Sequence, residues 1–250
     1  MTKVLEGRIA IITGAGGGIG RGVALAFADA GARLVLSDRS IGRLDETAAL
    51  CMQAGAQVKV VGADVTSEDE VNTIVRAAEV AFGGVDILLN NAGLLTSANI
   101  EDLSTAMWDH MIDVDLRSVY LATRAVLPHM RRQRWGRVIN IASQLALKGG
   151  EALSHYCAAK AGVIGFTKAV ALEVARENVL VNAIAPGPIE TPLLAGVSDE
   201  WKSAKIAALP LGRFGRVDEV APTAVLLASD PGGNLYVGQT LGPNSGDVMP

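Results

Sequence analysis

The segment RIAIITGAGGGIG, from Arg8 to Gly20, decides the fold of this chain. Its first half, Arg8–Thr13, is a short apolar run typical of a buried strand, and its second half is a glycine-rich turn. The turn follows the pattern T-G-x-x-x-G-x-G, with glycines at positions 14, 18 and 20. Positions without a side chain let the backbone turn tightly and approach a pyrophosphate at a helix N-terminus. The segment predicts a strand, a phosphate-binding turn and a helix in succession.

Short apolar runs alternate with stretches of helical periodicity along the rest of the chain. Near-continuous apolarity over five or six residues indicates strands covered on both faces, as in a parallel sheet. This alternation predicts the α/β class: one doubly wound parallel sheet of about seven strands, with helices on both faces, in a single domain over residues 1–250. We expect strands at Arg8–Thr13, Arg33–Ser37, Gln57–Val61, Asp86–Asn90, Arg137–Ala142 and Leu180–Ala185, and helices at Gly18–Ala30, Ile41–Ala54, Glu68–Phe82 and Tyr156–Arg176.

Composition and charge argue against several classes of protein. The chain has 26 acidic and 22 basic residues, a net charge of −4 and no basic block, so a nucleic-acid partner is not expected. It shows no signal-peptide pattern and no stretch long and apolar enough to span a bilayer, which favours a cytoplasmic protein without a membrane partner. Cys51 and Cys157 have no ligand-spaced histidine nearby. They are expected to be reduced thiols, without a disulfide or a metal site.

The end of the second expected strand carries a carboxylate, Asp38. Ligands of such sheets bind beyond the carboxyl ends of the strands. A carboxylate at this place can accept both ribose hydroxyls of an adenosine and would repel a 2′-phosphate, which favours NAD over NADP. Two alternatives stand beside this interpretation: Asp38 could only cap the following helix, and the guanidinium of Arg39 could offset the repulsion.

Small polar residues also follow the other expected strands. They lie in GADV (Asp64 and Val65), NNAG (Asn90–Gly93), INIASQ (Ser143) and PGPIETP (Pro186–Pro192). Each alone could be ordinary turn sequence. Together they predict a cleft along one edge of the sheet, because the carboxyl ends of parallel strands meet there.

The segment SHYCAAKAG places Tyr156 four residues before Lys160, so both side chains face the same way on a helix. Most such pairs are only a half-buried phenol beside a solvated amine. Oxidation of a secondary alcohol, however, needs a base, and a free tyrosine with a pKa of about 10 is a poor one at neutral pH. A lysine ammonium one turn away favours the phenolate and lowers the pKa of the tyrosine.

These motifs occur together and in order: TGAGGGIG, NNAG, a serine thirteen residues before the tyrosine, Y-x-x-x-K and PG-x-x-x-T. In this set the chain resembles the short-chain dehydrogenase/reductase family over essentially its whole length. The resemblance implies a Rossmann-like fold, with Tyr156 as catalytic acid/base, Lys160 on the nicotinamide ribose and Ser143 on the substrate oxygen. It implies cofactor contacts, in addition to Asp38, Tyr156 and Lys160, from Gly14, Gly18, Ile19, Gly20, Asp64, Val65, Asn91, Ala92, Gly93, Gly187, Ile189 and Thr191.

Two places depart from the family pattern. Asp115, in MIDVDLRSVY, stands where the family usually has an asparagine that helps a water continue the proton path from the lysine. The added charge makes Asp115 a candidate catalytic-site residue with an open role. The tail GQTLGPNSGDVMP differs from the usual V-D-G-G ending, and the family's C-terminus tends to lie at a subunit interface. A homotetramer is the assembly that the resemblance implies.

The leading hypothesis is an NAD-dependent dehydrogenase acting on a secondary alcohol or its ketone: a sugar, a polyol, a cyclic alcohol or a 3-oxoacyl thioester. The alternatives are a decayed NAD-binding protein and an NADPH-dependent 3-oxoacyl thioester reductase. Substrate choice is expected in Leu94–Ser97, in Gln144–Glu151 with Gln144 touching substrate, and in a lid at Pro186–Arg213.

Three other features are expected to be structural. His155 should point away from Tyr156, because neighbours on a helix diverge. Trp108 and Met111 should lie in the core or at an interface. The run His129–Arg137 should form a solvated helix end.

Overall fold

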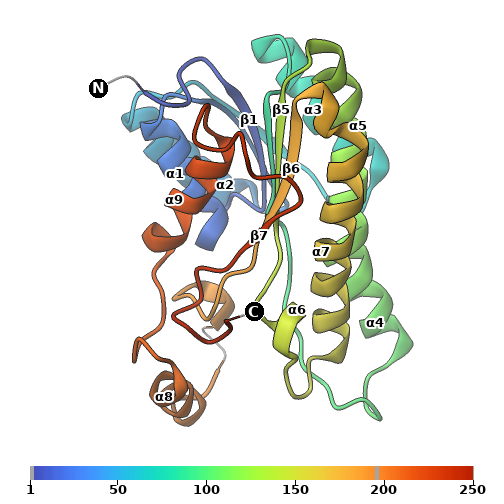
Figure 1. Ribbon diagram of the computed structural model, residues 1–250, viewed down its shortest axis with the longest axis vertical. Coiled ribbons are helices and arrows are strands. Elements are labelled where there is room, and N and C mark those ends of the chain that lie inside the picture. Colours follow the sequence, from blue (N-terminus) through green and yellow to red (C-terminus); the bar gives the residue numbers. More distant parts are fainter. Residues whose placement is uncertain (1–2, 195–196, 250) are drawn as a thin grey trace.

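A parallel sheet runs through the part of the chain that the computed structural model describes, residues 3–194 and 197–249 (Figure 1). Within these ranges it has seven strands in the order β3-β2-β1-β4-β5-β6-β7. The order of the chain reverses between β1 and β4, which is the switch point where such sheets bind ligands. The predicted α/β, doubly wound sheet is confirmed. Its strands are β1 (Ile9–Thr13), β2 (Arg33–Asp38), β3 (Val58–Gly62), β4 (Ile87–Asn90), β5 (Gly136–Ile141), β6 (Val179–Ile184) and β7 (Thr240–Leu241).

Helices cover both faces of this sheet, as Figure 1 shows. One face carries α1 (Gly18–Asp29), α2 (Ile41–Gln53) and α9 (Val217–Ala228). The other carries α3 (Glu68–Phe82), α5 (Ser118–Gln133) and α7 (Ser154–Val174). Three shorter helices lie beyond the carboxyl ends of the strands: α4 (Thr105–Ile112), α6 (Leu145–Lys148) and α8 (Asp199–Ala208).

The strand residues supply two apolar layers, one on each face. Successive side chains of a strand point to opposite faces, so neighbours enter different layers. Ile12 and Leu89 belong to the cluster under α1 and α9, whereas Ile11 and Leu88 belong to the cluster under α3 and α5. The central strands are therefore covered on both faces, as their apolarity predicts.

The structure differs from the expected strands and helices in two details, and it adds β7, a strand for which no range was predicted. β3 is an edge strand and its residues stay partly or fully exposed, so it is not covered on both faces. β7 spans only Thr240 and Leu241, too short for an apolar run to reveal it. The expected helix Tyr156–Arg176 begins at Ser154 and ends at Val174, where a short 3₁₀ turn follows.

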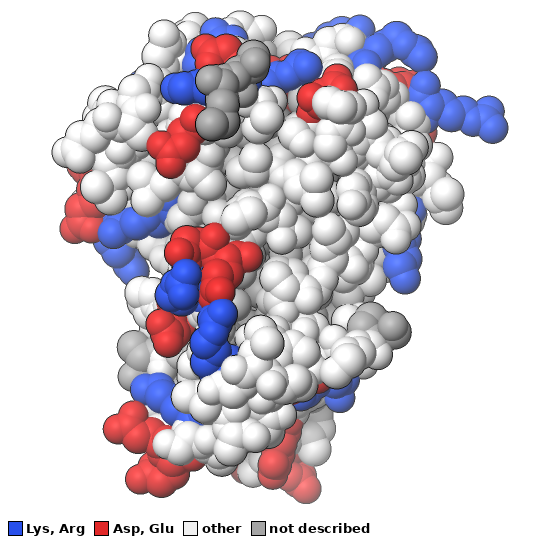
Figure 2. All heavy atoms as spheres, turned by 60° about the vertical axis from the view of Figure 1, so that its left-hand side comes forward, with Lys and Arg blue, Asp and Glu red and all other residues white. Residues whose placement is uncertain are grey.

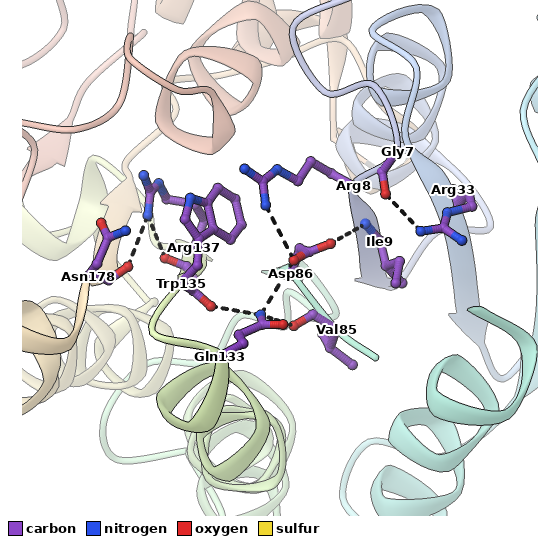
Figure 3. A network of polar contacts seen from close by, with 11 residues as sticks. Gly7, Arg8, Ile9, Arg33, Val85, Asp86, Gln133, Trp135, Arg137 and Asn178 are labelled. Carbon is purple, nitrogen blue, oxygen red and sulfur yellow. Dashed lines mark hydrogen bonds and ion pairs between the residues drawn. The ribbon is translucent and has the colours of Figure 1, made fainter. Parts of the chain in front are cut away.

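A polar network ties the amino ends of the strands together, opposite the predicted cleft (Figure 3). Asp86, just before β4, accepts a hydrogen bond from the Ile9 backbone N–H at 2.9 Å. It also pairs with the Arg8 guanidinium at 3.6 Å and accepts from the Gln133 amide at 3.4 Å. One carboxylate thus joins β1, β4 and the end of α5.

Arg137 extends this network, and it is fully buried. Its guanidinium donates to the Gly136 and Asn178 carbonyls at 2.9 and 3.2 Å and to Asn234 Oδ1 at 2.7 Å. The Trp135 ring lies between it and the Arg8 guanidinium, 4.4 and 3.6 Å from the ring centroid respectively. Burial lowers the pKa of Arg137 to about 10.

The expectation of a solvated helix end over His129–Arg137 was therefore wrong in its last part. α5 ends at Gln133. The arginines at positions 131 and 132, in its last turn, and at position 134, just after it, are exposed. Arg137 instead opens β5 and satisfies buried carbonyls, as polar groups inside a protein must be satisfied.

Figure 2 shows one face of the molecule, on which Lys and Arg side chains lie beside Asp and Glu side chains. Opposite charges on this face largely neutralise one another. Among the described residues, no helix is both long enough and apolar enough to cross a membrane.

Candidate active site

The glycine-rich turn and the NNAG segment form one cradle at the switch point. The Thr13 hydroxyl accepts from the backbone N–H groups of Asn91 and Ala92 at 3.1 and 3.2 Å. In return, the Asn91 side-chain amide donates to the carbonyls of Thr13 and Gly14 at 3.1 and 3.0 Å. The turns after β1 and β4 are thereby fixed to each other.

The glycines of the cradle are required by close approach. A Cβ on Gly14, whose φ is +64°, would lie 2.8 Å from Ala92 Cα, and one on Gly20 would collide with the Gly14 carbonyl. Gly18 has a φ of +52° and lies next to the Thr191 methyl group. The cradle can therefore bring backbone N–H groups at the start of α1 up to a pyrophosphate. This fits the nicotinamide dinucleotide that the turn predicts.

Asp38 stands at the tip of β2, against the glycine-rich turn. Its Oδ2 accepts from the Gly16 N–H at 3.1 Å and its Oδ1 from the Ser40 N–H at 3.0 Å. The second bond joins Asp38 to the residue that precedes α2. Asp38 therefore presents a carboxylate at the turn, and it bonds to the N-cap residue of α2 without capping the helix itself.

A hollow of about 340 Å³ opens near Asp38, at the ends of β2 and β3 and the first turns of α2 and α3; it is lined by Arg39, Ile41, Gly62, Ala63, Asp64 and Glu70. Asp64 accepts from the Thr66 N–H and hydroxyl at 2.9 and 2.7 Å, and these bonds lower the pKa of its carboxyl. Arg39 pairs with Asp64 across the hollow at 3.9 Å. The adjacent Val65 is buried. This hollow lies where the resemblance predicts the adenine, at Asp64 and next to Val65.

Lys160 lies at the centre of the second group of predicted residues. Its ammonium donates to the Ile141 carbonyl at 3.0 Å and pairs with Asp115 Oδ2 at 3.1 Å. It lies 5.8 Å from the centroid of the Tyr156 ring. Gly93 packs against both charges, since a Cβ there would lie 2.9 Å from Asp115 Oδ2 and 3.4 Å from the Lys160 nitrogen. β5, α7 and the NNAG turn thus meet at one buried ion pair.

Asp115 is fully buried and its orientation is fixed. It belongs to a π-helical segment, Asp113–Arg117, between α4 and α5, and such single-turn insertions are frequent at functional sites. Its Oδ1 accepts from the Leu94 N–H at 2.9 Å. The side chain, and not only the backbone, therefore faces Lys160 and holds the start of the Leu94–Ser97 segment.

Three charged or polar groups set the proton affinity of Tyr156. Burial raises the pKa of the phenol, Lys160 lowers it, Asp115 raises it and the Ser143 hydroxyl lowers it, with a net rise. For Lys160, burial acts to lower the pKa, but Asp115 and Tyr156 outweigh it and raise the pKa. Lys160 lowers the pKa of Tyr156, as the sequence predicts, but burial and Asp115 raise this pKa by more.

The remaining predicted residues line the other side of the cleft. A Cβ on Gly187 would collide with the backbone of Asn244, and Ile189 is buried and bridges to Gly215. Gln144 is buried beside Ser143, and its backbone N–H donates to the Pro186 carbonyl at 3.1 Å. Residues 195 and 196 of the expected lid lie outside the described ranges.

Of the residues expected to be structural, Met111 is buried and Trp108 partly exposed. His155 is fully buried, and its Nε2 lies 2.8 Å from the Thr96 hydroxyl. The ring thus supports the Leu94–Ser97 segment. Spacing on a helix predicts that His155 diverges from Tyr156, but not which loop it meets.

The family model for short chain dehydrogenases matches residues 8–202. The chain belongs to the short-chain dehydrogenase family. It is 37% identical to a 3-oxoacyl-[acyl-carrier-protein] reductase of Thermotoga maritima, covering 98% of this chain and 99% of that one. It is 39% identical to a D-beta-hydroxybutyrate dehydrogenase of Cupriavidus necator, over 91% and 93% of the two chains.

The fold agrees with this membership. The crystal structure of a Sinorhizobium meliloti protein assigned as a short-chain alcohol dehydrogenase superposes with a TM-score of 0.95 at 34% identity, covering 99% of this chain and 98% of that one. The predicted resemblance to the short-chain dehydrogenases is confirmed. The protein is an oxidoreductase that moves a hydride between a nicotinamide cofactor and a carbonyl or hydroxyl group.

Proposed function

We propose that this short-chain dehydrogenase oxidises a small secondary alcohol with NAD, and that Ser143, Tyr156 and Lys160 carry out the proton chemistry. The observation that carries this proposal is the buried ammonium of Lys160. It is fixed between Asp115 and the Ile141 carbonyl, one turn from Tyr156 and behind Gly93 of the cofactor cradle. A buried, paired lysine beside a buried phenol is an arrangement suited to general base catalysis.

The roles follow from the chemistry of each group. Ser143 orients the substrate oxygen by a hydrogen bond, and Tyr156 takes its proton as the carbon loses a hydride. Lys160 stays positive because Asp115 stabilises it, so it offsets the negative charge that develops on the phenol. When bound, the oxidised nicotinamide supplies the hydride acceptor. Gly14, Gly18, Ile19, Gly20, Asp64, Val65, Asn91, Ala92, Gly93, Gly187, Ile189 and Thr191 line the path along which the dinucleotide would lie.

NAD is the cofactor that we propose, because Asp38 lies at the end of β2 against the glycine-rich turn, where it would repel a 2′-phosphate. Arg39 pairs with Asp64, and Arg21, which donates to the Gly16 carbonyl, pairs with Glu46. Like charges about 4 Å apart near a protein surface repel by about 4 kcal/mol before salt screening. We expect kcat/KM to favour NAD over NADP by at least about tenfold.

Steady-state kinetics with both cofactors measure this preference. Asp38→Asn should reduce it, whereas Asp29→Asn, at the far end of α1, should leave it unchanged. A preference for NADP in the unchanged protein would show that Arg39 recruits the phosphate. That result would favour the second candidate below.

The pH dependence of alcohol oxidation should respond to Asp115→Asn. The rate rises as pH passes the pKa of Tyr156, and Asp115 raises that pKa. Removing its charge should therefore move the rise to lower pH, while the asparagine Oδ1 can still accept from the Leu94 N–H. Profiles of kcat/KM against pH for both forms decide this. An unmoved rise would mean that Asp115 does not act on the phenol.

A second candidate is the NADPH-dependent reduction of a 3-oxoacyl thioester. It is favoured by the 37% identity to the Thermotoga maritima 3-oxoacyl-[acyl-carrier-protein] reductase. The same Ser143, Tyr156 and Lys160 would serve it in reverse, with the phenol donating a proton. The cofactor preference separates the two candidates. A homotetrameric assembly and a cytoplasmic location stay predictions from the sequence.

A further inference from the structure

The C-terminal tail, residues 242–249, follows β7 and runs near α6 and α8 (Figure 1). Its Pro243 carbonyl accepts from the Gly187 N–H at 3.1 Å. Its Ser245 carbonyl accepts from the Leu211 N–H at 3.2 Å, just after α8. The tail is folded on itself by a 2.8 Å bond from the Asn244 amide to the Val248 carbonyl. The tail is therefore held both to the turn after β6 and to the segment after α8.

Asp247 is the charged residue of this tail, and its side chain is only 7% exposed. Its Oδ1 lies 2.7 Å from the ammonium of Lys148, the last residue of α6. Its Oδ2 lies 2.6 Å from the ammonium of Lys205, in α8. One buried carboxylate thus joins α6 to α8 through Lys148 and Lys205.

The ionised form of Asp247 is the stable one. Burial acts to raise the pKa of this carboxyl, but hydrogen bonds from Lys148 and Lys205 outweigh it and hold the pKa below its usual value. A buried carboxylate that loses such partners costs far more than an exposed one. Removing either lysine from Asp247 is therefore expected to destabilise the protein more than breaking an exposed ion pair.

α8 has little buried surface besides this contact. It buries no side chain, and Trp201, its largest apolar residue, is 46% exposed. A helix with so little buried surface is among the segments that open most easily. The pair between Lys205 and the buried Asp247 is the contact best placed to keep α8 against the cleft.

We propose that Asp247 is a positioning residue of the substrate site, which fastens α8 to α6 through its two ion pairs. The proposal rests on the proposed function in one respect, that substrate binds at Ser143 and Tyr156. Asp247 touches neither the cofactor cradle nor the Lys160 pair. Its loss should weaken substrate binding and leave cofactor binding intact.

The test compares Asp247→Asn, Lys205→Met and the double variant with the unchanged enzyme. Without the Asp247 contact, α8 should be held in place in only a fraction of the molecules. The apparent affinity for substrate then falls in proportion to that fraction. We expect KM for the alcohol to rise by about tenfold in each single variant, with a smaller change in kcat and an unchanged NAD dissociation constant. Because both substitutions break one contact, the double variant should resemble Asp247→Asn rather than show the product of two effects. Asp247→Glu should restore part of the affinity.

Lys202→Met is the matched control, since Lys202 is in the same helix but pairs with Asp199 within it at 3.5 Å. It should leave KM unchanged. Hydrogen exchange of α8, measured without substrate, should rise in Asp247→Asn and not in the control. Hydrogen exchange does not depend on turnover. A protein that oxidises no alcohol would therefore refute the proposed function, while the exchange of α8 would still test the role of Asp247. Unchanged exchange of α8, or an equal loss of NAD affinity and kcat, would overturn the proposal.

Discussion

Replacing Tyr156 by phenylalanine should lower kcat by about a thousandfold, within the range of 10²–10⁴ that a positioned general acid or base contributes. The phenol is buried beside Lys160 and is the one proposed proton acceptor, so a ring without a hydroxyl cannot take the proton. The NAD dissociation constant should change little, because many backbone and side-chain groups of the cradle hold the dinucleotide. Steady-state kinetics and a cofactor titration measure the two quantities.

Tyr120→Phe is the matched control for this substitution. Tyr120 is 41% exposed on α5, where its hydroxyl accepts from Arg124 at 2.7 Å. Its replacement should leave kcat unchanged. Retention of most of the activity by Tyr156→Phe would contradict the assignment of the proton acceptor.

Asp115→Ala should reduce the free energy of unfolding by about 3–5 kcal/mol, the cost of removing one partner of a buried ion pair. Within the described residues, the substitution leaves the buried Lys160 ammonium with only the Ile141 carbonyl as partner. It also removes the acceptor of the Leu94 N–H. Denaturant unfolding followed by circular dichroism measures the loss.

Asp113→Ala is the control from the same π-helical segment. Asp113 pairs with Arg117 at 3.6 Å, but both side chains are about half exposed, and such pairs contribute at most about 1 kcal/mol. An equally small loss for Asp115→Ala would mean that the Lys160 ammonium finds other partners. The ion pair would then not be what fixes the lysine.

The fold was largely predictable because the strands that matter are continuous apolar runs. β1, β2, β4, β5 and β6 were each placed to within one residue at either end. β3 was also placed closely, but its exposure could not be predicted, because an edge strand and a central strand can have similar apolar content. The two residues of β7 pair with β6 through backbone bonds alone, and no side-chain pattern marks them.

The site was predictable where a motif ties residue type to chemistry. The glycines at positions 14 and 20 are fixed by steric contact, and Tyr156 and Lys160 by helical spacing. The direction of the Asp115 side chain was not predictable, because it depends on a π-helical turn that redirects residues by one position relative to an α-helix.

Long-range partners were beyond the sequence. Asp247 lies in a tail without periodicity, and its two lysines are 99 and 42 residues away. Arg137 ends a basic run that looks solvated, yet it bonds to the Asn178 carbonyl just before β6 and to Asn234 Oδ1 between α9 and β7. Only the packing of distant segments distinguishes these buried charges from the ordinary surface charges around them.

The most direct measurement of the central claim is a panel assay that follows nicotinamide absorbance. Sugars, polyols, cyclic alcohols and 3-hydroxyacyl thioesters are offered to the unchanged enzyme and to Tyr156→Phe, each with NAD and with NADP. We predict reduction of NAD by at least one of these alcohols, faster than reduction of NADP, and its near-complete loss in Tyr156→Phe. Binding of NAD without turnover of any member of the panel, or turnover that survives the loss of the phenol, would contradict it.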